Sequence, residues 1–210
     1  MPMRGWVMKT LLLVLGCLCL ISPVFADNFP KSDRFNATYD DVNDVTTISD
    51  KVTWGDSIPG TGDEITGHGL FLTLQIKFQG KKYNSDDPNT TAALIFIEMH
   101  YDMNATSFLY EDQDPVALLV DGNRTKLGNA YYSQNVGGDD IIGKRELEIL
   151  TIPVDLPLLD TIAQAKVVKG AITAKNPTTA GSFRFGNDQF RLVNMALDYL
   201  DAFKDKTTTK

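Results

Sequence analysis

The chain has 210 residues, a formal net charge of −7 and 43% apolar residues, an ordinary composition for a globular protein. Its net negative charge repels phosphate backbones and anionic headgroups, which argues against nucleic-acid binding and peripheral membrane binding as general roles. Both cysteines, Cys17 and Cys19, lie near the N-terminus, so no disulfide framework is expected.

Residues 1–26 have the pattern of a secretory signal peptide. Arg4 and Lys9 precede an apolar run, and small residues end the pattern at Ala26. The apolar run is too short to span a bilayer, so we expect export with cleavage after Ala26 and no transmembrane segment in the mature chain. Cleavage would leave 184 residues with a net charge of −9 and no thiol, which suits a periplasmic or extracellular bacterial protein.

A lipoprotein is the alternative for the same segment. Val14, Leu15 and Gly16 precede Cys17 as they would in a lipobox, and acylation of Cys17 would then anchor the chain to a membrane. This alternative places the start of the mature chain at Cys17 instead of Asp27.

The first half of the expected domain consists mainly of strands. Phe35–Tyr39 predicts a short strand or a bend, Val45–Trp54 predicts one or two short strands, and the glycine-rich stretch Gly55–Gly69 predicts a loop. Leu70–Gly80 alternates apolar and polar residues, which is typical of a strand with one face on the core. Ala92–Tyr101 is apolar on both faces, so we expect a central strand covered on both sides.

The second half predicts more strands and two helices. Val116–Val120 and Arg124–Leu127 form a hairpin through Asp121-Gly122-Asn123, in which Gly and Asn accept positive φ values. Lys144–Val154 changes the phase of its apolar residues, which predicts a bulge near Ile149 or a strand that changes its packing partner midway. Two helices are predicted: one near 156–165 that starts at Asp155, and one near 188–203 capped by Asn187 or Asp188. The remaining predicted elements are an edge strand at Phe108–Tyr110, a turn at Gly137–Asp140, and paired strands at Val167–Ala174 and Ser182–Phe185.

These elements predict a mostly-β protein, a two-layer antiparallel β-sandwich with a short helix and a C-terminal helix. Its expected domains are the signal peptide 1–26, a single β-sandwich domain 27–204 and a disordered tail 205–210. The C-terminal helix has an apolar stripe of Phe190, Val193, Leu197 and Leu200, which must lie against an open sheet face or the end of the sandwich.

The candidate catalytic and metal-binding residues form no recognisable set. His68 and His100 have no partner at the spacing of a zinc site or a nucleophile and its base, so we expect no catalytic residues and no metal ligands. Several carboxylates stand in short clusters typical of solvated turns, such as Asp40-Asp41 with Asp44 and Asp86-Asp87. No cofactor is expected. Calcium is the one that such turns could take, for instance at Glu111, Asp112 and Asp114 or at Asp139 and Asp140, but their spacing does not match a helix-loop-helix calcium loop.

Aromatic residues are the candidates for contact with a ligand. Trp54, Tyr131 and Tyr132 could stack on a sugar or a peptide, and adjacent tyrosines on a strand point to opposite faces. One of the two tyrosines is therefore expected to be exposed if the other belongs to the core.

The chain resembles a group of secreted bacterial β-sandwich domains. The resemblance lies in Tyr39–Thr47, Leu70–Gly80, Leu119–Gly122, Ile162–Val168 and Phe185–Leu200. It implies the fold and the compartment, and it carries over no functional residue.

We therefore expect an exported, non-enzymatic β-sandwich domain that binds a protein, a glycan or another surface in the bacterial envelope. The alternative is a carbohydrate- or ester-active hydrolase that uses acidic residues near His100, which would require His100 to lie within hydrogen-bonding distance of a carboxylate in an open pocket.

Overall fold

The computed structural model describes residues 29–51, 69–102, 116–127, 129–139, 144–172 and 183–204, and within them it gives only the backbone at 98–102, 132, 134–139, 144–146 and 183. The helices are α2 (Leu156–Gln164) and α3 (Asn187–Asp201). The strands are β1 (Phe35–Asp40), β2 (Val45–Asp50), β3 (Gly69–Gln79), β4 (Thr91–Asp102), β5 (Val116–Val120), β6 (Asn123–Thr125), β7 (Tyr131–Asp139), β8 (Lys144–Val154), β9 (Val168–Ile172) and β10 (Phe183–Gly186).

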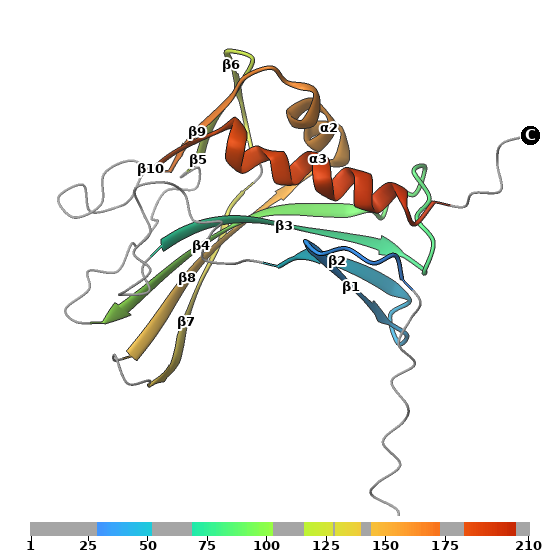
Figure 1. Cartoon of the computed structure of the whole chain (residues 1–210), viewed down its shortest axis with the longest axis horizontal. Helices are drawn as coiled ribbons and strands as arrows, with labels where there is room; N and C mark the ends of the chain where they lie inside the picture. The colour runs from blue at the N-terminus through green and yellow to red at the C-terminus, as the bar shows by residue number, and fades with distance from the viewer. Residues whose placement is uncertain are drawn as a thin grey trace, which may run out of the picture.

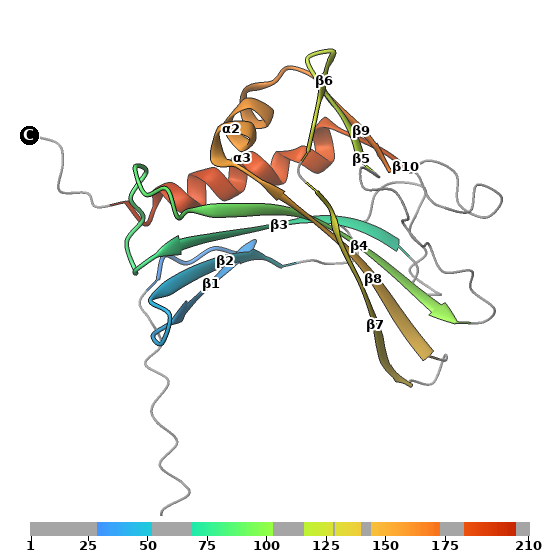
Figure 2. The same ribbon diagram turned by 180° about the vertical axis from the view of Figure 1, so that it is seen from behind.

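The described strands form two antiparallel sheets. The larger sheet has the order β1-β2-β3-β4-β8-β7 and the smaller has the order β10-β9-β5-β6. Figures 1 and 2 show the large sheet strongly twisted, with α3 lying across one of its faces and the small sheet beyond the start of α3. The predicted mostly-β, sandwich-like antiparallel fold with two helices is confirmed.

The strand β4 lies in the middle of the large sheet, between β3 and β8, and keeps its register with both along its length. Leu94 and Phe96 are at most 1% exposed, whereas Ile95 and Ile97 on the opposite face are only half-buried. The predicted central position is therefore confirmed, but the predicted full burial of both faces is wrong. The helices pack on the face that carries Leu94 and Phe96, and the opposite face is covered only in part, although Phe71, in register with Ile97, is 1% exposed.

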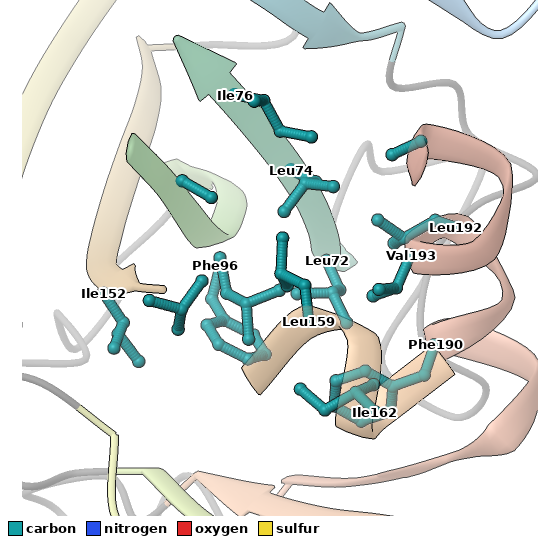
Figure 3. Packing of buried hydrophobic residues seen from close by; sticks show 14 of the residues in the cluster. Leu72, Leu74, Ile76, Phe96, Ile152, Leu159, Ile162, Phe190, Leu192 and Val193 are labelled. Carbon is teal, nitrogen blue, oxygen red and sulfur yellow. The ribbon is translucent and has the colours of Figure 1, made fainter. Parts of the chain in front are cut away.

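The main core lies between that face of the large sheet and the two helices. Figure 3 shows Leu72 and Leu74 of β3 and Phe96 of β4 facing residues of α2 and α3. The buried residues of the two helices are Leu159 and Ile162 in α2, and Phe190, Leu192, Val193, Ala196, Tyr199 and Leu200 in α3. The buried face of α3 is wider than the predicted stripe because α3 contacts both β3 and α2, and Leu197 lies half-buried at its margin.

The two helices begin in different ways. Asp155 caps α2 as predicted, because its Oδ1 accepts a hydrogen bond of 2.8 Å from the Leu158 amide. Helix α3 is capped by Gly186 and not by Asn187 or Asp188. Asn187 instead joins α3 to β9: its Oδ1 accepts from the Val168 amide at 2.6 Å, and its Nδ2 donates to the Lys166 carbonyl at 2.8 Å.

Three predictions of local structure are wrong. The β5–β6 turn has positive φ at Asp121 and Gly122, while Asn123 already pairs with Val120 as the first residue of β6. The predicted turn at 137–140 is partly strand, since β7 continues to Asp139 with a register shift after Val136. No bulge occurs near Ile149, because β8 keeps its register with β4 throughout; its phase change reflects apolar positions on both faces of a central region of the sheet.

Several predicted segments lie outside the described residues. They are the signal peptide, the loop up to residue 68, the strand at 108–110, the turn at 175–181 and the tail 205–210. In the part of the chain that the structure describes, no helix combines the length and apolar character needed to cross a membrane.

Candidate functional site

The predicted aromatic residues are not brought together by the described structure. Tyr131 opens β7, the last strand of the large sheet, and its side chain is 66% exposed. Tyr132 is described only by its backbone, opposite Leu150, and Trp54 lies outside the described residues. Tyr131 therefore remains the one described candidate for stacking.

His100 lies in β4, and its backbone is paired with Glu146 of β8. Two positions earlier in β4, Glu98 is paired with Glu148, whose side chain is only 1% exposed. This register brings acidic positions beside His100. The structure describes neither the side chains of His100 and Glu146 nor any part of His68. Among the described side chains, no group of three or more His, Cys, Asp or Glu residues is placed to hold a metal ion.

The acidic cluster at the β1–β2 turn is held by hydrogen bonds within the chain. Asp40 accepts hydrogen bonds from the Val42 amide at 3.0 Å, the Asn43 amide at 3.2 Å and the Asn43 Nδ2 at 2.6 Å. The hydrogen bonds from Asn43 are the main reason that the pKa of Asp40 is lowered. These contacts show a carboxylate that stabilises a turn, as the sequence predicts.

Asp44 completes the same turn in the left-handed conformation, with φ of 53°. Its Oδ1 accepts from the Tyr39 hydroxyl at 2.6 Å and its Oδ2 accepts from the Gln79 Nε2 at 3.0 Å. Both hydrogen bonds lower the pKa of Asp44, and the one from Tyr39 has the larger effect. The acidic turn thus connects β1 to the end of β3.

The small sheet has an inner and an outer face of different character. Its inner face meets the core through Phe185, whose ring lies 5.2 Å from that of Phe96 and 5.6 Å from that of Phe190. Gly170 lies beneath this ring, because a Cβ built on Gly170 would stand 2.0 Å from the Phe185 Cε2. The packing of Phe185 over Gly170 therefore fixes which side of the sheet faces outward.

The outer face of the small sheet carries cations and small or apolar side chains. In register across the sheet, Leu119 of β5 lies between Arg124 of β6 and Lys169 of β9, and Arg184 of β10 pairs with Ala171 of β9. We call this surface the basic face, defined by the outward positions Ala117, Leu119, Arg124, Lys169, Ala171 and Arg184. None of these six positions holds a carboxylate.

The three cations of the basic face are exposed, and they make no ion pair with other described residues. Leu119 is 40% exposed among them, and Val167, directly before β9, is 43% exposed. These are two of the five large apolar side chains that are exposed in the described part of the chain. The basic face thus presents positive charge and apolar surface side by side in a chain of net charge −7.

Two shallow hollows flank α2 beside the basic face. The larger, of about 570 Å³, lies between the start of β4, the end of β8 and Lys126, and Thr90, Thr91 and Thr125 contribute hydroxyl groups to its lining. The smaller, of about 410 Å³, continues on the other side of Thr125 toward Gln164. Both hollows are open to solvent, and neither is lined by the three cations of the basic face.

The residues of the basic face were not among the candidates from the sequence. The hairpin pattern could have placed Arg124 opposite Leu119, because a two-residue turn fixes that register. The alignment of Lys169 with Leu119 depends on the pairing of β5 with β9, which joins strands about 50 residues apart and leaves no local signal.

Comparison with known proteins adds no relative: the chain matches no family model and no curated protein.

Proposed function

We propose that the chain is an exported, non-enzymatic domain that binds a partner or a surface in the bacterial envelope. The observation that carries the proposal is the basic face, where Arg124, Lys169 and Arg184 are exposed around Leu119 and have no ion-pair partner among the described residues. Charged side chains that stabilise the fold form hydrogen bonds or ion pairs within the chain, as Asp40 and Asp44 do. Exposed cations that no described residue pairs with, beside an exposed leucine, are suited to an acidic target.

Export rests on the sequence pattern that ends at Ala26, and the fold is compatible with cleavage there. Phe29 already packs on Phe203, with ring centroids 5.4 Å apart, and the Pro30 carbonyl accepts a hydrogen bond of 2.5 Å from the Tyr199 hydroxyl. A cut after Ala26 would leave these contacts intact. N-terminal sequencing of the protein from an exporting host should give Asp27 first, whereas an acylated Cys17 would establish the lipoprotein alternative.

Co-sedimentation with washed bacterial envelopes tests the binding role. We expect the protein to sediment with the envelopes, to be released by salt, and to lose this behaviour in the double variant Lys169→Gln/Arg184→Gln. The matched control is Lys31→Gln/Lys77→Gln, which removes the same charge from exposed positions away from the basic face. Failure of the protein to sediment, or equal behaviour of the two variants, would contradict the proposal.

A hydrolase that uses acidic residues near His100 is the alternative, and the backbone register that pairs His100 with Glu146 is the observation that supports it. Its test is hydrolysis of nitrophenyl esters and glycosides by the protein and by His100→Ala and Glu146→Gln. Turnover that both substitutions abolish would replace the binding role with the enzymatic one.

A further inference from the structure

We propose that the basic face docks on an anionic phospholipid surface, an inference that rests on the binding role proposed above and names its target. The first argument is the composition of the face. Arg124 and Lys169 lie on either side of Leu119 in one row of the sheet, about 10 Å apart at the usual strand spacing. Cations around an exposed aliphatic side chain match the boundary between headgroups and acyl chains, where phosphate and hydrocarbon lie close together.

The second argument is the size of the face. Four strands of up to five residues cover roughly 300 Å². A stable protein interface needs about 800 Å² on each partner, so a protein would have to extend well beyond the basic face. A lipid surface needs no matching outline, because headgroups rearrange around whatever side chains approach them.

The third argument concerns the rest of the charge. The acidic turn with Asp40, Asp41 and Asp44 lies at the opposite end of the molecule from the small sheet (Figures 1 and 2). At physiological ionic strength the Debye length is about 8 Å, so distant carboxylates hardly weaken the attraction of the basic face to a nearby surface. The overall negative charge instead favours one orientation, with the basic face toward the lipid and the acidic turn away from it.

Residues at the edge of the basic face favour the same orientation. Val167 is exposed near Leu119. The Val167 amide donates a hydrogen bond of 2.8 Å to the Oδ1 of Asp121, the carboxylate of the β5–β6 turn. Lys126 and Lys166 are also exposed next to the small sheet. The edge therefore supplies one more aliphatic group and two more cations to the docking surface, together with the hydrogen-bonded carboxylate of Asp121.

Vesicle binding tests the inference with the protein recovered from an exporting host. We expect it to bind vesicles of phosphatidylglycerol mixed with phosphatidylcholine, to ignore vesicles of phosphatidylcholine alone, and to be released by salt. Lys169→Gln/Arg184→Gln should weaken binding on the order of thirtyfold, since each cation near an anionic surface contributes about fivefold. Lys31→Gln/Lys77→Gln should bind like the unmodified protein.

A second pair of variants tests the apolar part of the face. Leu119→Ser should weaken vesicle binding several-fold even where salt has removed most of the attraction between charges, because it removes aliphatic surface. Met195→Ser is its control, since Met195 is 46% exposed on α3, away from the small sheet. Equal losses in the two variants would contradict docking through Leu119.

The envelope and vesicle experiments together separate the two proposals. A protein that sediments with envelopes through its basic face but ignores anionic vesicles binds a protein or a glycan there, which overturns the lipid target and keeps the binding role. A protein that binds neither overturns both.

Discussion

The acidic β1–β2 turn and the basic face of the small sheet use their charges in opposite ways. Asp40 and Asp44 accept five hydrogen bonds from within the chain, and the pKa of each is lowered by them. Arg124, Lys169 and Arg184 make no ion pair with described residues. The fold therefore uses the carboxylates of the acidic turn, whereas no described residue forms an ion pair with the cations of the basic face.

The largest expected effect comes from removing the support of the basic face. Gly170→Ala places a Cβ 2.0 Å from the Phe185 Cε2, so the ring must leave its contacts with Phe96 and Phe190. We expect a loss of about 3 kcal/mol in the free energy of unfolding, a large part of a total of about 5 to 15. Denaturant unfolding measures it, with Ala171→Ser on the outer face as the control. A loss no greater than that of the control would mean that the small sheet packs differently.

A cation that is engaged inside the chain should behave unlike those of the basic face. Arg34 forms an ion pair with Asp50, whose side chain is fully buried, and its Nη2 donates to the Asp50 Oδ2 at 2.8 Å. Arg34→Gln should cost about 3 kcal/mol in unfolding free energy, because the Asp50 carboxylate would stay buried without its counter-charge. Adding Asp50→Asn should restore part of that loss, and a double-mutant cycle measures the coupling. Additive losses would show that the pair does not act as a unit.

The acidic turn should make stability depend on pH. Since hydrogen bonds lower the folded-state pKa of Asp40 and Asp44 below 3.8, their contribution is complete above that value and is lost as the pH falls through the lower folded-state pKa. Thermal melts across this acidic range should therefore show a smaller fall in Tm for Asp44→Asn than for the unmodified protein. An identical fall would indicate that these hydrogen bonds do not persist in solution.

The smallest effect on stability is expected at the basic face itself. Lys169→Gln/Arg184→Gln removes two exposed cations without an ion-pair partner among the described residues, so the free energy of unfolding should change by no more than about 0.5 kcal/mol. Denaturant unfolding of this variant beside Lys31→Gln/Lys77→Gln checks it. A large loss would mean that the cations serve the fold, and the contrast with the acidic turn would disappear.

The local patterns of the sequence predict most elements because each depends on nearby residues. The alternation in Leu70–Gly80 predicts β3, and the Asp155 side chain followed by Pro157 predicts the start of α2. The errors arise where contacts with distant parts of the chain determine how far a residue is buried. Ile95 and Ile97 are only half-buried, while the helices pack on the other face of β4, and no local pattern states on which face a helix will pack.

The candidate site was harder to predict than the fold. Tyr131 was predicted as a possible exposed aromatic residue, and it is exposed. The basic face depends on three pairings, of which only the β5–β6 hairpin is local. Because the other two join β9 to β5 and to β10, the coincidence of Leu119, Lys169 and Arg184 on one surface follows from topology and not from spacing.

The contacts between the two ends of the described chain have a consequence for how the protein folds. The Tyr199 hydroxyl reaches the Pro30 carbonyl across 169 positions of sequence, and Tyr83 bridges to Lys204. Such long-range contacts slow folding, because the chain must close large loops before the contacts form. The N-terminal segment therefore cannot complete its packing until α3 has been synthesised. We expect a chain of this kind to reach its final packing only after its synthesis is complete.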